Sequence, residues 1–174
     1  GNIFGICGGM QMIGETLADP FGFEDSKEKN SSERHVGLRL LPIQTVFEHK
    51  KTVLERETIS IWPERSYLKG FELHYGKSQL IKNSKEKVEP IMKDEDLGWV
   101  SKSNNQTIVA GSYLHGIFDN GKWRRSWINQ IRQKKNLSKL PIDISNYSEK
   151  REYLINLLAD IFDKHIDLSP ILRP

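Results

Sequence analysis

The chain has 174 residues, with 26 basic and 23 acidic side chains and a formal net charge of +3. This length predicts one domain, with a core large enough to need neither disulfides nor a structural metal. So small a charge surplus does not indicate a nucleic-acid-binding protein, and no apolar run of 18 residues predicts a membrane span. The single cysteine excludes an internal disulfide framework, so we expect a cytoplasmic protein.

The first residues predict half of a βαβ unit. An apolar run over 2–7 is typical of a strand buried on both faces, and Gly8 and Gly9 form a tight turn. Apolar residues at helical spacing over 10–17 predict a helix, which the Asp19-Pro20-Phe21-Gly22 stretch would end. Strand, turn and helix together favour an α/β fold. A chain that begins in a strand and without methionine is expected to be part of a longer polypeptide.

The middle of the chain is predicted to be mostly β. After a polar loop over 26–33, short strands are expected over 36–42, 45–47, 52–56, 58–62 and 70–76, with an extension over 79–81. A charged surface stretch follows over 82–96. A hairpin is predicted from 98–101 and 107–114, with its turn at 104–105 and His115 at the end of its second strand.

Two helices are predicted near the end of the chain, over 123–135 and 148–165, with a loop over 141–146 between them. The first carries many of the basic residues between Lys122 and Lys139. Its aromatic residues Trp123 and Trp127 are spaced i, i+4, which favours a core-facing stripe over a nucleic-acid surface. The basic residues are therefore interpreted as a solvated helix face.

Cys7 is the strongest candidate for chemistry. Gly5 and Gly9 flank it symmetrically, which lets the chain turn sharply from strand to helix and exposes the side chain. The helix N-terminus is expected to lower the thiol pKa, and the Gly8 N–H to stabilise an oxyanion. The alternative is a free buried cysteine beside a flexible turn.

A cysteine nucleophile needs a base, and histidine is the usual partner. His115 is the best of the five histidines, because the end of an apolar strand lies at the sheet edge where α/β active sites gather. His74, in a strand bounded by Gly70 and Gly76, is second. A purely structural histidine remains the alternative for both. His35, His49 and His165 lie among charged residues and are expected at the surface.

Three separated motifs together resemble a class I glutamine amidotransferase domain, and within it the C-terminal glutaminase branch of the cobyric acid synthases. They are Gly-Ile-Cys-Gly-Gly-Met-Gln over 5–11, Gly-Phe-Glu-Leu-His-Tyr-Gly over 70–76, and Gly-Ser-Tyr-Leu-His-Gly-Ile-Phe-Asp-Asn over 111–120. The stretches over 19–24 and 37–42 and the leucine-rich last helix are also similar to this branch. The resemblance implies a flavodoxin-like α/β three-layer sandwich that lacks its first strands.

The resemblance also implies roles for individual residues. Cys7 would attack the side-chain amide of glutamine, His115 would act as base and then as acid, and Gly8 would donate to the oxyanion. Gln11 and the backbone around Leu73 and His74 would line the glutamine pocket. The family usually has a glutamate two residues after the catalytic histidine, but this chain has Ile117 there. Glu72 and Asp119 are the candidates to replace it.

The resemblance further implies a partner domain. Residues 1–174 would be the C-terminal portion of the glutaminase domain, with a helical tail over 122–174. The ammonia would pass to an ATP-dependent synthetase domain that lies outside these residues. No Gly-x-x-x-x-Gly-Lys-[Ser/Thr] motif occurs here, so ATP and Mg²⁺ are expected there, with no cofactor in this chain.

The acceptor implied by the resemblance is adenosylcobyrinic acid a,c-diamide, whose peripheral carboxylates would be amidated. The isolated chain is expected to be inactive. Sister enzymes that amidate the a and c carboxylates of the corrin, or a cell-wall precursor, are the nearest alternatives. A docking module without catalysis and a cysteine peptidase-like hydrolase are the others.

Overall fold

The computed structural model describes residues 1–22, 33–82, 84, 86–102 and 107–167. The first sheet has the strand order β1-β10-β9-β8, the second has the order β3-β2-β4-β7, and β5 pairs with β6 alone. The first sheet consists of β1 (Asn2–Ile6), β8 (Val88–Pro90), β9 (Gly98–Lys102) and β10 (Ile108–Ser112). The other strands are β2 (Thr16–Asp19), β3 (Glu33–Val36), β4 (Ile43–Val46), β5 (Thr52–Ser60), β6 (Ser66–His74) and β7 (Lys77–Leu80).

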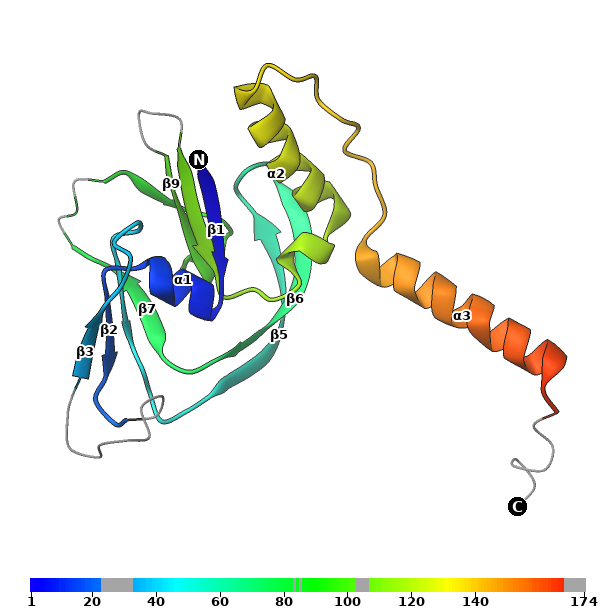
Figure 1. Ribbon diagram of the computed structural model, residues 1–174, viewed down its shortest axis with the longest axis horizontal. Helices are drawn as coiled ribbons and strands as arrows, with labels where there is room; N and C mark the ends of the chain where they lie inside the picture. Colours follow the sequence, from blue (N-terminus) through cyan, green and yellow to red (C-terminus); the bar gives the residue numbers. More distant parts are fainter. Residues whose placement is uncertain (23–32, 83, 85, 103–106, 168–174) are drawn as a thin grey trace.

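Helices cover both faces of the first sheet (Figure 1). On one face lies α1 (Gly8–Ile13), whose Met10 packs so closely over β10 that a Cβ at Gly111 would lie 2.4 Å from its Cγ. On the other face, the Phe4 ring packs edge-to-face on Trp123 and Trp127 of α2 (Gly121–Lys134). This α–β–α layering confirms the predicted three-layer α/β class.

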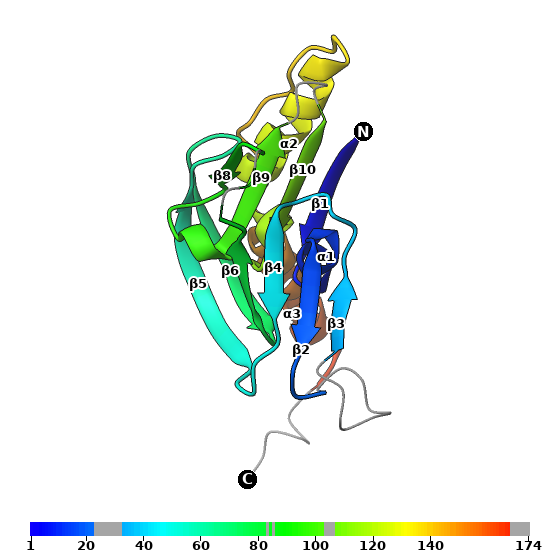
Figure 2. The same cartoon turned by 90° about the vertical axis from the view of Figure 1, so that its left-hand side faces the viewer.

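The second sheet and the long, curved β5–β6 hairpin lie beside this sandwich (Figure 2). Trp62, just after β5, accepts a hydrogen bond from Trp123 Nε1 at 3.0 Å and stacks edge-on against Trp127. Asn120, which precedes α2, donates to the backbone O of Lys69 in β6 and accepts from its N–H. These contacts fix the hairpin against α2, and they satisfy the indole N–H of the buried Trp123.

The predicted helix over 10–17 is wrong in its second half. The helix ends at Ile13, and the chain then leaves it to form β2, which pairs in parallel with β4. The strand predicted over 36–42 is also wrong beyond Val36. Backbone N–H groups of 37–41 donate instead to carbonyls of 12–15, where the last turn of α1 would otherwise leave acceptors unpaired.

The first strand is placed correctly but is not buried on both faces. Among the described strands, β1 pairs only with β10, and Ile3 and Ile6 are 42% and 36% exposed. The charged stretch over 82–96 is not a simple surface excursion either. It contains β8, the 3₁₀ turn η1 (Glu95–Leu97), and the fully buried Ile91 and Met92.

Other predictions are confirmed with small shifts. The hairpin of β9 and β10 and the helix α2 are present, while the two strands predicted over 52–62 are one continuous strand, β5. The strand predicted over 70–76 begins earlier, at Ser66, and the expected extension is β7. The predicted turn at 104–105 and nearly all of the polar loop over 26–33 lie outside the described residues.

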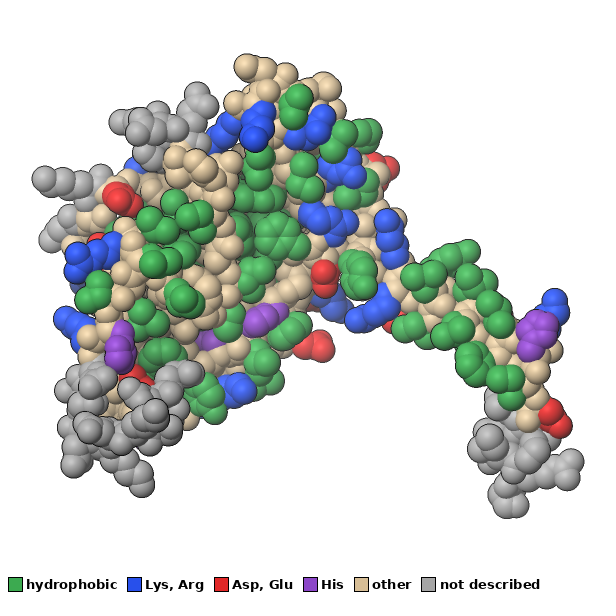
Figure 3. Space-filling model, in the orientation of Figure 1, with side chains coloured by type: hydrophobic (Ala, Val, Ile, Leu, Met, Phe, Trp, Pro, Cys, Tyr) green, Lys and Arg blue, Asp and Glu red, His purple; other side chains and the backbone are tan. Residues whose placement is uncertain are grey.

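The last helix, α3 (Tyr147–His165), extends away from the rest of the chain (Figure 1). A capping box of Asn146 and Glu149 starts it. None of its residues is buried, and apolar side chains cover much of the surface of this helix (Figure 3). Neither α3 nor any other helix in the described ranges is long and apolar enough to cross a membrane.

Gly5 is a steric requirement of the strand-to-helix turn. A Cβ at this position would lie 2.6 Å from the backbone carbonyl carbon of Gly9, whereas a Cβ at Gly9 would meet nothing within 4 Å. We predict that Gly5→Ala lowers the free energy of unfolding by about 1–3 kcal/mol, the usual cost of overpacking. Gly9→Ala is the matched control and should not destabilise the protein. Urea unfolding followed by tryptophan fluorescence checks both, and equal stabilities would contradict the prediction.

Candidate active site

Cys7 occupies a sharp turn immediately after β1. Its φ of 53° and ψ of −115° lie in a region that residues with a Cβ rarely adopt. Its N–H donates to the Ser112 carbonyl at 2.8 Å, and its carbonyl accepts from the N–H groups of Met10 and Gln11. The chain is therefore held on both sides of the turn at the carboxyl end of the strand, but Cys7 is half-buried and not exposed as predicted.

The Cys7 thiol is a hydrogen-bond donor in this structure. Its Sγ lies 3.4 Å from the Leu73 carbonyl oxygen. Burial raises the pKa of the thiol, and the backbone N–H of Gly8 only partly opposes this effect. The expected net lowering of the thiol pKa by the helix N-terminus is therefore wrong, since α1 has only six residues and the sulfur is half-buried. Such a thiol needs a base to become a nucleophile.

His115 lies at the same sheet edge as Cys7. β1 and β10 are parallel neighbours, with Ile6 opposite Ser112, so the residues that follow both strands emerge together. The strand predicted over 107–114 is shorter in the structure. It ends at Ser112, as β10, and His115 comes three residues later. There His115 exchanges two backbone hydrogen bonds with Phe71 of β6, at 2.8 and 3.2 Å.

The surroundings of His115 leave one ring nitrogen unused. The imidazole stacks on the Phe71 ring at a centroid distance of 4.9 Å and an interplanar angle of 8°. A Cβ at Gly70 would lie 2.2 Å from the His115 carbonyl, so only glycine permits this approach. The Nε2 of His115 is buried and has no hydrogen-bond partner among the described residues. Unsatisfied buried groups are rare, and a catalytic base often finds its partner only when substrate binds.

The usual third member of the catalytic group is not replaced by a described carboxylate. Ile117, at the family's glutamate position, is fully buried in the hydrophobic core. Glu72 forms a hydrogen bond with His74 at 3.0 Å and an ion pair with Arg56. Asp119 is exposed, two residues beyond Ile117. Within the described ranges, Cys7 and His115 therefore remain the candidate pair without a carboxylate as third member, and the His115 ring is stacked on Phe71.

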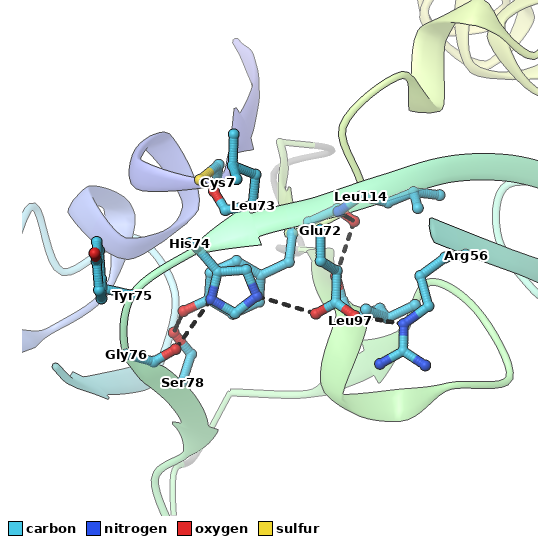
Figure 4. A network of polar contacts seen from close by, with 12 residues as sticks. Cys7, Arg56, Glu72, Leu73, His74, Tyr75, Gly76, Ser78, Leu97 and Leu114 are labelled. Atoms are coloured by element: carbon cyan, nitrogen blue, oxygen red, sulfur yellow. Dashed lines mark hydrogen bonds and ion pairs between the residues drawn. The ribbon is translucent and has the colours of Figure 1, made fainter. Parts of the chain in front are cut away.

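One strand contacts all three of the predicted catalytic and glutamine-binding side chains. Along β6 and its extension, alternate residues meet His115 (through Phe71), Cys7 (through the Leu73 carbonyl) and Gln11 (through the Tyr75 carbonyl). Gln11 Nε2 also donates to the Tyr113 hydroxyl at 3.1 Å. Figure 4 shows Cys7 beside Leu73, with the His74 side chain on the opposite side of the strand. Leu73 is thus placed at the site through its backbone.

The space beside the nucleophile is open. A Cβ at Gly8 would meet nothing within 4 Å, and a hollow of about 330 Å³ adjoins Gly8 and Gln11. Leu17, Asp19 and Phe47 form much of its other wall. The Gly8 N–H is hydrogen-bonded to the Cys7 sulfur, and the same residue lines a cavity of small-molecule size.

Several contacts at the site have no clear signal in the sequence. Phe71, Tyr75 and Tyr113 belong to apolar or alternating strand patterns that predict only burial. His35, His49 and His165 are exposed, as predicted. No group of three or more histidine, cysteine, aspartate or glutamate side chains in the described part of the chain could hold a metal ion.

Comparisons with known proteins show the family of this chain. A family model described as a CobB/CobQ-like glutamine amidotransferase domain matches residues 1–123. The cobyric acid synthase of Prochlorococcus marinus strain MIT 9313 is 52% identical over 172 residues, 99% of this chain and 34% of that protein. That of Prochlorococcus marinus strain NATL1A is 49% identical over 173 residues, 99% of this chain and 35% of that protein.

The cobyric acid synthase of Synechococcus sp. strain CC9311 is 44% identical over 177 residues, again covering 99% of this chain and 34% of that protein. Each of the three relatives thus matches nearly the whole of this chain. The chain itself spans about a third of the length of these curated relatives.

The raised thiol pKa has a measurable consequence. Because thiolate is the reactive species, we expect iodoacetamide to alkylate Cys7 slowly near neutral pH, with a rate that rises with pH beyond the range of an ordinary thiol. Mass mapping of the peptide that contains Cys7 measures the rate, and free cysteine is the reference. If the alkylation rate instead reached its plateau at a pH below the range of an ordinary thiol, burial would not be the dominant effect on the Cys7 pKa.

Proposed function

Because this chain belongs to the CobB/CobQ-like glutamine amidotransferase family, we propose that it hydrolyses glutamine to glutamate and ammonia at Cys7 and His115. The observation that carries the proposal is that the strained turn at Cys7 and the unsatisfied Nε2 of His115 belong to residues that follow two neighbouring parallel strands, β1 and β10. This arrangement provides a nucleophile and a base at one sheet edge.

In the first half-reaction, His115 takes the proton from the Cys7 thiol, and the sulfur attacks the side-chain amide carbon of glutamine. The negative oxygen of the tetrahedral intermediate accepts a hydrogen bond from the Gly8 N–H. His115 then returns the proton to the amide nitrogen, the carbon–nitrogen bond breaks, and ammonia leaves. A glutamyl thioester on Cys7 remains.

In the second half-reaction, His115 removes a proton from water, and the resulting hydroxide attacks the thioester carbonyl. The carbon–sulfur bond breaks, glutamate leaves, and the proton returns to the Cys7 sulfur. The substrate is held by Gln11 and by the backbone near Leu73 and His74. The open space at Gly8 leaves room for the glutamine side chain.

We further propose that the ammonia serves an ATP-dependent amidation of corrin carboxylates, such as those of adenosylcobyrinic acid a,c-diamide. The similarity to the cobyric acid synthases supports this acceptor. Since the chain spans about a third of those relatives, we place the ATP, Mg²⁺ and corrin sites in the remaining part of the polypeptide. No cofactor is assigned to the residues described here.

The principal test compares Cys7→Ser and His115→Asn with the wild type in the full-length polypeptide. With ATP, Mg²⁺ and the corrin diamide present, we expect glutamine-dependent amidation to fall at least about 10³-fold in either variant, as for other nucleophile–base pairs. With ammonium as the nitrogen donor, amidation should be unchanged. Corrin mass and glutamate release are the two readouts.

Each outcome distinguishes one alternative. Glutamine-dependent activity that survives Cys7→Ser would overturn the glutaminase proposal and favour a docking module. Glutamate release without corrin amidation would keep the glutaminase and overturn the acceptor. Amide hydrolysis that is independent of any ATP-linked acceptor would favour a hydrolase.

A further inference from the structure

On the face of β6 opposite the site, two buried side chains, Glu72 and His74, connect to the partly exposed Arg56 of β5. The side chains of Glu72 and His74 are each only 7% exposed, and Arg56 of the neighbouring strand β5 forms an ion pair with Glu72 Oε1. The other carboxylate oxygen of Glu72, Oε2, lies 3.0 Å from His74 Nε2. His74 Nδ1 lies 3.0 Å from the Gly76 carbonyl oxygen (Figure 4).

The partners of His74 determine its protonation. A backbone carbonyl can only accept a hydrogen bond, so Nδ1 must carry a proton. An ionised carboxylate can also only accept, so Nε2 must carry a second proton. The Arg56 guanidinium, which is always charged, donates to the other oxygen of the Glu72 carboxylate. The hydrogen bonds are therefore all satisfied only when His74 is an imidazolium.

The imidazolium is connected to the glutamine-binding side. Its ring lies flat on the Tyr113 ring, at a centroid distance of 3.7 Å and an angle of 14°, which suits a cation–π contact. The Tyr113 hydroxyl accepts from Gln11 Nε2 and shares a 2.6 Å hydrogen bond with Ser78 Oγ. His74 thus supports Gln11 through one intervening side chain.

The same imidazolium also holds the strand. By bonding Glu72 on one side and the Gly76 carbonyl on the other, it spans five consecutive residues, 72–76. The backbone carbonyls of Leu73 and Tyr75, which contact Cys7 and Gln11, lie within that span. A displacement of the span would move both contacts together.

We propose that His74 is a positioning residue that donates hydrogen bonds from both ring nitrogens and, together with Glu72 and Arg56, aligns the Leu73 and Tyr75 carbonyls that hold Cys7 and Gln11. It takes no proton from Cys7, because both of its nitrogens are occupied. This role deepens the glutaminase function proposed above and rests on it. It makes His74 distinct from His115, whose Nε2 has no partner in the described residues.

The first test observes protonation directly, without turnover. Nitrogen-15 spectra of the full-length polypeptide, labelled at histidine and assigned with a His74→Phe variant, should show protons on both His74 nitrogens near neutral pH. In Glu72→Gln, whose amide can serve as donor or acceptor, the obligatory second proton should be lost. A wild-type His74 with one protonated nitrogen would overturn the proposal, whatever the enzyme's activity.

The second test measures kinetics. We expect Glu72→Gln and His74→Phe to lower kcat/KM for glutamine about 10- to 100-fold, the cost of a small misplacement of reacting groups, and to leave ammonium-dependent amidation unchanged. His74→Phe keeps a ring against Tyr113 but removes both donors. His165→Gln, at the exposed end of α3, is the matched control and should keep wild-type kinetics. Circular dichroism and urea unfolding verify that the variants fold.

The outcomes separate this inference from the proposed function. Wild-type kcat/KM in His74→Phe would show that the hydrogen bonds of His74 do not align the site, and would overturn the inference. If Cys7→Ser retained glutamine-dependent activity, the glutaminase itself would fail, while the protonation of His74 would still be decided by the spectra.

Discussion

The backbone of Cys7 is held in a conformation that costs about 1–3 kcal/mol for a residue with a side chain, and the surrounding structure must offset that cost. Three backbone hydrogen bonds do so: the Cys7 N–H donates to β10, and the Cys7 carbonyl accepts two from α1. Gly5 contributes by letting the Gly9 backbone pass within contact of the strand. Parallel pairing of β1 with β10 then brings His115 to the same edge. The positions of Cys7 and His115 therefore depend on this turn, on Gly5 and on the pairing of β1 with β10.

The sequence allowed the nucleophile turn and the central hairpin to be predicted because both depend on short-range patterns. Glycines on either side of Cys7 permit only a few backbone paths, and alternating apolar residues specify a strand wherever it pairs. The early end of α1 could not be predicted in this way. It depends on carbonyls capped by residues 37–41, which are far along the chain. Tertiary hydrogen bonds there outweigh local helix preference.

In the active site, too, features set by local sequence could be predicted and features set by distant contacts could not. Cys7 and His115 are recognisable because their chemistry is tied to residue type and to the ends of strands. The direction of the Cys7 pKa shift was predicted wrongly, since burial cannot be deduced from a five-residue motif and outweighs the short helix. The contacts of Phe71 and Tyr113 were not predictable either. Each is an aromatic residue in a strand, and only the fold determines which ring or amide lies against it.

Strand β6 carries a neutral backbone contact to the site on one face and the buried side chains of Glu72 and His74 on the other. Side chains in a strand alternate between faces, so a slip of one residue against β5 would exchange these two faces, and a slip of two would advance the strand by about 7 Å. No intermediate register exists. Damage that slips this register would therefore reduce the number of competent molecules and leave the turnover of the correctly paired ones intact, whereas a smaller shift within the native register slows each molecule. Titration of active sites would report such damage as a smaller burst amplitude with an unaltered rate constant.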